Sequence, residues 1–77
     1  MKRDEGANRA FQFLWDHAKS GKSFTLPELI NASGWTSGNT KTNLTKRLKD
    51  LVSRKGRVYY ANPEIFRVRL EDFQDLF

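Results

Sequence analysis

The chain has 77 residues, of which 14 are basic and 9 acidic, a net charge of +5, and no cysteine. A chain of this length forms one small domain (1–77), and without cysteine it lacks disulfides, thiolate metal ligands and a thiol nucleophile. No apolar run approaches the ~18 residues of a transmembrane helix and we expect no signal peptide, so we expect a soluble, cytoplasmic protein, or a nuclear one in a eukaryote.

The first predicted element is an amphipathic helix over about residues 7–19. Gly21 follows it at the usual place of a glycine that ends a helix. The polar residues 1–6 before it are expected to be disordered. The helical spacing is carried by Ala7, Ala10, Phe11, Leu14, Trp15 and Ala18.

A short second helix is predicted to begin at Thr25. Glu28 lies three residues further on, as in a capping box, and Pro27 fits the first helical turn. Ser23–Thr25 could add a small edge strand. The helix is expected to end near Gly34, with Leu26, Leu29 and Ile30 facing inward.

The third predicted helix begins between Thr36 and Asn39 and runs to about Arg54, where Lys55-Gly56 ends it. Its inward stripe is Leu44, Leu48, Leu51 and Val52.

After Gly56 the apolar residues recur at every second position. Alternating residues over 57–60 and 66–70, on either side of Asn62-Pro63-Glu64, predict a β-hairpin. Residues 71–77 could form a short C-terminal helix. Three helices followed by a hairpin give an α+β fold. The aromatic residues expected in its core are Phe11, Trp15, Phe24, Trp35, Tyr60 and Phe66.

This order resembles the winged helix-turn-helix family. The segment LPELINASGWTSGNTKTNLTKRLKDL (26–51) carries the likeness, with a glycine, an apolar residue and a threonine at Gly34, Trp35 and Thr36, and with central leucines. Thr40 departs from the family, which often has Val or Ile there, although its methyl group can still pack. The resemblance implies a three-helix winged helix-turn-helix with a C-terminal two-stranded β-hairpin wing, and binding of double-stranded DNA.

The charge distribution favours a polyanionic partner. Residues 37–60 carry seven basic side chains against Asp50 alone, more than the net charge of the whole chain. A field concentrated in this way is typical of nucleic-acid binding, although a solvated lysine-rich helix would give the same composition.

A helical projection of the third helix identifies the candidate contacts. Its outward side chains suit base edges in a major groove, and flanking lysines suit phosphates. Arginines of the expected hairpin could contact the backbone or a narrow minor groove. The candidate nucleic-acid-binding residues are Thr36, Asn39, Lys41, Thr42, Asn43, Lys46, Lys49, Arg54, Arg57, Arg67 and Arg69.

The sequence indicates a binding module and not an enzyme. His17 is the single histidine and lies away from the basic segment, and no residues have the spacing of a metal site, a phosphate loop or a nucleophile with its base. We therefore expect no cofactor, no metal, no membrane contact and no small-molecule substrate. Two alternatives remain: a winged helix that binds another protein domain through the tail LEDFQDLF, and one that binds structured RNA.

Overall fold

The fold begins with a long helix, α1 (Glu5–Ser20), in a computed structural model that describes residues 5–77. Gly21 ends the helix with φ 70°, as predicted. Of residues 1–6, which we expected to be disordered, 1–4 lie outside the described part and the last two are helical. The predicted helix is confirmed, and its apolar stripe is buried at Ala7, Ala10 and Leu14.

The short strand and second helix are also confirmed, as β1 (Ser23–Phe24) and α2 (Leu26–Ser33). The backbone N–H of Thr25 donates to the Glu28 carboxylate at 2.8 Å, and the Thr25 hydroxyl donates to the same oxygen at 3.1 Å. Gly34 ends the helix at φ 80°. The local capping signals therefore fixed both ends of α2.

The third helix starts as predicted but is shorter. It consists of α3 (Ser37–Thr42) and a π-helical turn, η1 (Asn43–Arg47). The N–H of Leu48 donates to the Asn43 carbonyl at 2.8 Å, and Leu48 then leaves the helical conformation at φ −107°, ψ 12°. The expectation that the helix reaches Arg54 is wrong: Leu51 and Val52 are buried by a chain that turns back and enters a strand.

The hairpin lies earlier than predicted, in β2 (Val52–Lys55) and β3 (Val58–Ala61). The two-residue loop between them is Gly56-Arg57. Gly56 has φ 63°, and Arg57 does not have a positive φ, because only glycines do in the described chain. This pattern fits a type II′ turn, which needs glycine at its first central position and matches the strand twist. The strand predicted over 57–60 is thus confirmed as β3, but the expectation that residues 66–70 form its hairpin partner is wrong, because β3 pairs with β2.

The predicted turn residue Asn62 has another role. Its amide accepts from the Ser53 hydroxyl at 2.7 Å and donates to the Asp50 carbonyl at 3.4 Å, which ties the end of β3 to the start of β2. The chain continues into a 3₁₀ helix, η2 (Pro63–Arg67), and not into a second strand of a hairpin. Proline is well suited to the first turn of a helix because its missing N–H costs nothing there.

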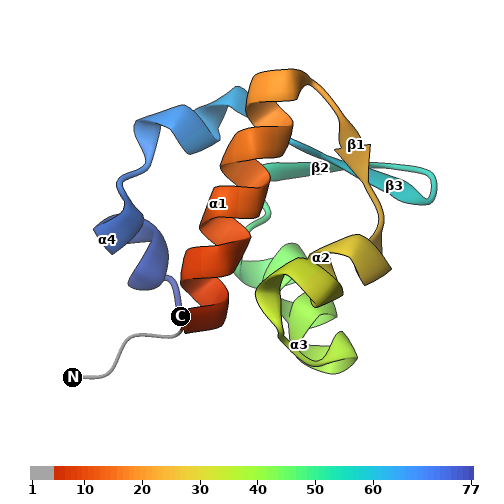
Figure 1. The fold of residues 1–77 in the computed structure, drawn as a ribbon, viewed down its shortest axis with the longest axis horizontal. Helices are drawn as coiled ribbons and strands as arrows, with labels where there is room; N and C mark the ends of the chain where they lie inside the picture. Colours follow the sequence, from red (N-terminus) through yellow and green to blue (C-terminus); the bar gives the residue numbers. More distant parts are fainter. Residues whose placement is uncertain (1–4) are drawn as a thin grey trace.

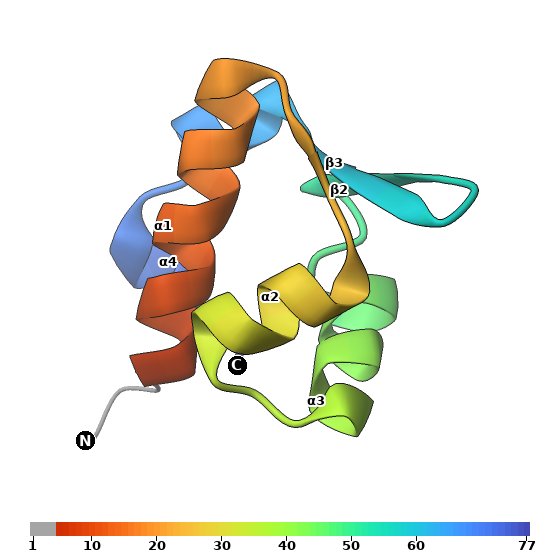
Figure 2. The same ribbon diagram turned by 45° about the vertical axis from the view of Figure 1, so that its right-hand side comes forward.

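The C-terminal residues form α4 (Leu70–Gln74), which confirms the short helix predicted for residues 71–77. Phe73 is fully buried, and its ring lies 5.1 Å from that of Phe11 on α1. Figures 1 and 2 show α4 and the hairpin on opposite sides of α1, with α2 and α3 beneath the hairpin. The described chain is thus an α+β fold of four α-helices and an antiparallel sheet in the order β1-β3-β2.

Two of the aromatic residues that we expected in the core are exposed, and the register of the sheet explains one of them. Phe24 of β1 pairs with Tyr59 of β3, which pairs with Arg54 of β2, so these three side chains share one face of the sheet. Tyr60 points to the other face and is 38% exposed, while Phe66 in η2 is 44% exposed. Tyr59, which was not among the expected core residues, is half-buried and stacks on Phe24 at 5.8 Å.

Candidate nucleic-acid interface

The start of α3 is fixed by two threonines. The hydroxyl oxygen of Thr36 accepts from the Asn39 N–H at 3.1 Å, as an N-cap does. Thr40 is fully buried, and its hydroxyl donates to the Thr36 carbonyl at 2.8 Å. The threonine that departs from the family pattern thus packs inward with its polar atom satisfied, which orients the helix.

Most of the predicted contact residues on this helix face the solvent. The exposed side chains of α3 and η1 include four of them, namely Asn39, Lys41, Thr42 and Lys46. Lys49 lies in the exposed turn after η1, and Arg54 lies on β2.

Asn43 is the exception, because it is only 6% exposed. Its side-chain oxygen accepts from Nη1 of Arg47 at 2.9 Å, and it shares a small cavity with Trp35 and Phe77. The helical projection assumed a regular α-helix, whereas Asn43 begins the π-helical turn η1 and lies beside Trp35 and Phe77, which no local pattern reveals. The expectation that Asn43 faces a groove is wrong.

Within residues 5–77, the basic side chains of this region form no ion pair with an acidic residue. All seven lysines and arginines from Lys41 to Arg57 are exposed, and none of them forms an ion pair with an acidic residue among residues 5–77. The ion pairs that the structure shows lie elsewhere, between Arg9 and Glu5 at 3.7 Å and between Arg69 and Glu71 at 3.2 Å. The positive charge of the segment is therefore not neutralised within the described fold.

A concave site lies between α3 and the hairpin, which we call the basic hollow. It has a volume of about 500 Å³. Two cations and a hydroxyl line it, from Lys41, Thr45 and Arg54. The remaining lining is apolar or aromatic and comes from Leu26, Leu44, Val52 and Tyr59. The tertiary structure thus brings together Lys41 and Arg54, which lie on different elements.

Arg54 is held in place at the edge of this hollow. Its Nε donates to the Gly56 carbonyl at 2.9 Å, and its Cζ lies 6.0 Å from the centroid of the Tyr59 ring. These contacts orient the planar guanidinium, while its terminal nitrogens make no hydrogen bond with residues 5–77. An oriented guanidinium loses less conformational entropy when it binds an anion.

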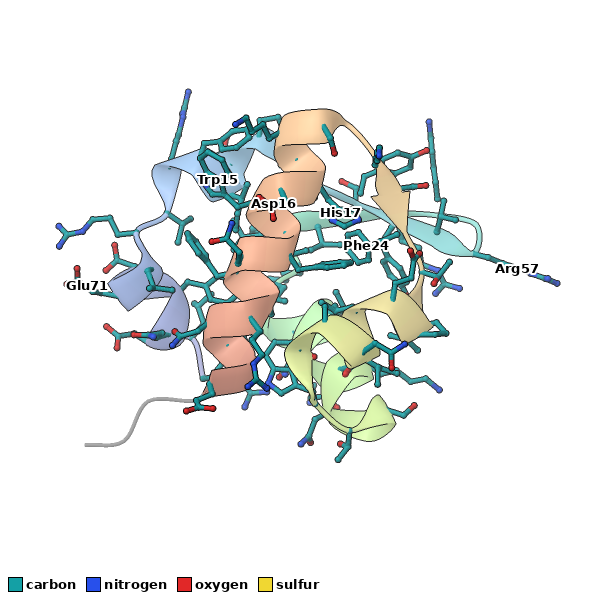
Figure 3. All side chains as sticks on the ribbon, in the orientation of Figure 1. Trp15, Asp16, His17, Phe24, Arg57 and Glu71 are labelled. Atoms are coloured by element: carbon teal, nitrogen blue, oxygen red, sulfur yellow. The ribbon has the colours of Figure 1, made fainter. Side chains whose placement is uncertain are left out.

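The remaining predicted arginines do not form one group. Arg57 lies at the tip of the hairpin and extends into solvent, at the far side of the molecule from Glu71 (Figure 3). Arg67 belongs to η2 and Arg69 precedes α4, where it pairs with Glu71. The expectation that all three arginines share a hairpin is wrong, because the wing was placed one strand too late.

Sequence reasoning missed two lining residues. Thr45 follows Lys41 by one helical turn, and its hydroxyl donates to the Lys41 carbonyl at 2.6 Å. That i, i+4 spacing was available in the sequence, but only the fold shows that this part of the helix faces the hairpin. Tyr59 was missed because its position depends on the strand register, which no local pattern fixes.

His17 packs in an aromatic cluster. Its Nδ1 lies 2.8 Å from the Phe13 carbonyl, and its ring contacts those of Phe13 and Phe24, at 4.0 and 5.6 Å. Over residues 5–77, no three histidine or carboxylate side chains group as metal ligands would, and no helix is both long and apolar enough to cross a membrane. Comparison of the chain with protein-family models, curated proteins and solved structures found no match.

Proposed function

We propose that this protein is a winged-helix domain that binds double-stranded DNA, with α3 in the major groove and the β2–β3 hairpin beside the backbone. The order of elements supports this proposal: a helix, a short helix, a turn, a basic helix and a hairpin follow one another as in that family. The short strand β1 joins the hairpin into one sheet, which holds the hairpin next to α3.

The observation that carries the proposal is the set of exposed basic side chains on α3, η1 and the hairpin, which have no acidic partner in the described part of the chain. A surface of this kind gains free energy on DNA because it releases condensed counterions from phosphates. The major groove is about 12 Å wide and admits an α-helix. Because Thr40 of α3 and Leu44 of η1 close the core-facing side of this helical segment, its opposite side is available for such a groove.

Three exposed residues of α3 and η1 have side chains suited to the groove. Asn39 can form two hydrogen bonds with adenine, and the Thr42 methyl group can contact thymine. Lys46 can reach guanine or a phosphate. Lys49 follows the helix and Arg57 is at the hairpin tip, so both would contact the backbone on either side of the inserted helix.

The test is fluorescence anisotropy with a labelled random-sequence duplex at low and moderate salt. We compare the wild type with Lys46→Ala/Lys49→Ala and with a matched control, Arg67→Ala/Arg69→Ala, which removes the same charge from the other side of the fold. The slope of log affinity against log salt should become shallower by about two units in the first variant only. Absence of binding at low salt, or equal losses in both variants, contradicts the proposal.

A second candidate function is binding to another protein. Phe66 and Leu70 are 44% and 41% exposed, and the Phe66 ring packs edge-on against Trp15 at 5.0 Å. These side chains lie on η2 and α4 and the adjoining part of α1, away from the basic hollow. The tail itself is less available than expected, because Phe73 is buried against α1.

Competition by an RNA hairpin in the same assay tests the structured-RNA alternative. A-form RNA exposes a shallow minor groove and not a major groove that side chains can read, so an RNA-binding protein would prefer the hairpin to the duplex DNA.

A further inference from the structure

We infer that the basic hollow is a binding site for one unpaired nucleotide of the bound DNA, with the phosphate between Lys41 and Arg54 and the base on the apolar floor. This inference rests on the DNA-binding function proposed above and names a DNA feature that the same surface would prefer.

The floor of the hollow is unusual for a surface that contacts only phosphates. Leu44 and Val52 are almost fully buried at its base, and Leu26 and the ring of Tyr59 are half-buried around them. Its volume of about 500 Å³ lies within the range of pockets that hold small molecules. An apolar floor of this size stabilises a flat, weakly hydrated group such as a nucleobase, which a bare phosphate contact does not require.

The rim supplies the charge that a nucleotide needs. Lys41 and Arg54 approach the hollow from different elements, and neither has an acidic partner in the described chain. The hydroxyl proton of Thr45 is committed to the Lys41 carbonyl at 2.6 Å, so its methyl group and oxygen lone pairs remain for a ligand. The guanidinium of Arg54 is already oriented by Gly56 and Tyr59, and a guanidinium can bind phosphate with two parallel N–H groups.

A base that is paired and stacked in a duplex cannot reach such a floor. Proteins that bind a base in a pocket either extrude it from the helix or bind it where it is already unpaired. The hollow holds one aromatic ring and no row of them, so it fits a single nucleotide and not a length of single strand. An extrahelical nucleotide beside the α3 groove would place its phosphate at the rim and its base inside.

The experiment compares three labelled duplexes of the same sequence by anisotropy: fully paired, with one bulged thymidine, and with one bulged abasic residue. The protein should bind the bulged-thymidine duplex about tenfold more tightly than either of the others. Equal affinity for all three overturns the nucleotide site and leaves the DNA-binding proposal standing. A preference for both bulged duplexes also overturns it, because the kink and not the base is then recognised. No binding to any duplex contradicts the proposed function itself.

Two variants locate the preference. Arg54→Ala should lose it, whereas Lys55→Ala, which removes the same charge from the next residue on the opposite face of β2, should keep it. Loss in both variants or in neither overturns the site. Thymidine monophosphate serves as a competitor. If micromolar nucleotide displaces the bulged duplex, the hollow is a site for free nucleotides. If the bulged duplex stays bound at millimolar nucleotide, the hollow is a site for a nucleotide within a strand. Circular dichroism checks that each variant is folded.

Discussion

The guanidinium of Arg54 lies over the ring of Tyr59, with Cζ 6.0 Å from the ring centroid. On the other neighbouring strand the same ring stacks on Phe24 at 5.8 Å, because the register aligns these three residues across the sheet. The positive charge at the edge of the basic hollow is therefore positioned by a row of side chains that reaches into the core. This row connects the packing of the sheet to the proposed DNA contact.

Arg54→Lys should weaken binding to duplex DNA although the charge is kept. Lysine has neither the Nε–H that donates to Gly56 nor a planar group that stacks on Tyr59. The oriented guanidinium can bind phosphate with two parallel N–H groups, which an ammonium cannot, so we expect a loss of about two- to fivefold in anisotropy titrations. The melting temperature should fall by no more than a few degrees, because a cation–π contact at an exposed site contributes about 0.5–1 kcal/mol. Wild-type affinity in this variant would show that the orientation of the guanidinium has no role.

Asn43→Ala should affect mainly stability, whereas Thr42→Ala should affect mainly DNA binding. Asn43 is buried and accepts a hydrogen bond from Arg47, so its replacement should lower the free energy of unfolding by about 1 kcal/mol. Thr42 is exposed, so its replacement should change stability by less than about 0.5 kcal/mol but weaken DNA binding. Urea unfolding and anisotropy separate the two effects. A strong, stability-independent loss of affinity in Asn43→Ala would contradict the buried position.

Phe73→Ala should destabilise the fold by about 3–5 kcal/mol, as for other buried aromatic residues. Phe73 is fully buried and contacts Phe11 and Phe77, with ring centroids at 5.1 and 5.4 Å. Leu76→Ala is the matched control on the same tail, because Leu76 is exposed and should cost under about 0.5 kcal/mol. Similar urea midpoints for the two variants would mean that α4 does not pack on α1.

Gly56→Ala should cost about 1–2 kcal/mol, because an L-residue is strained at φ 63° in the hairpin loop. A methyl group there would meet no atom within 4 Å, so the cost is conformational and not steric. Gly38→Ala is the control: its added methyl is equally unobstructed, its φ is not positive, and it lies in α3. Alanine should stabilise α3 by up to about 1 kcal/mol. Destabilisation by both substitutions would argue against the loop conformation.

The stability of α2 should depend on pH through Glu28. The hydrogen bond from the Thr25 backbone N–H, with that from its hydroxyl, lowers the pKa of Glu28 below its ordinary value. A lowered pKa in the folded state adds stability above the unfolded pKa of about 4.3, and this stability is lost as the pH falls through the folded pKa. Glu28→Gln removes this titration. The difference in melting temperature between wild type and variant should therefore be constant near neutral pH and shrink in acid. A difference that stays constant down to acid pH would contradict the capping box.

The sequence alone determined the elements whose signals are local. The amphipathic stripe and Gly21 gave α1, the capping box and Gly34 gave α2, and Thr36 gave the start of α3, because each signal acts within one or two helical turns. The α+β class and the concentration of charge in residues 37–60 were also available from the sequence.

Only the tertiary structure decided where the third helix ends, which strands pair, and which cations meet. Leu51 and Val52 fit the spacing of a helix, but their burial is also satisfied in a turn and strand, and Gly56 with its two-residue loop favours the latter. The basic hollow depends on that choice, since the strand register places Arg54 beside Tyr59, and both line the hollow together with Lys41. Long-range pairing is set by the sum of many packing contacts, so a local period could not reveal it.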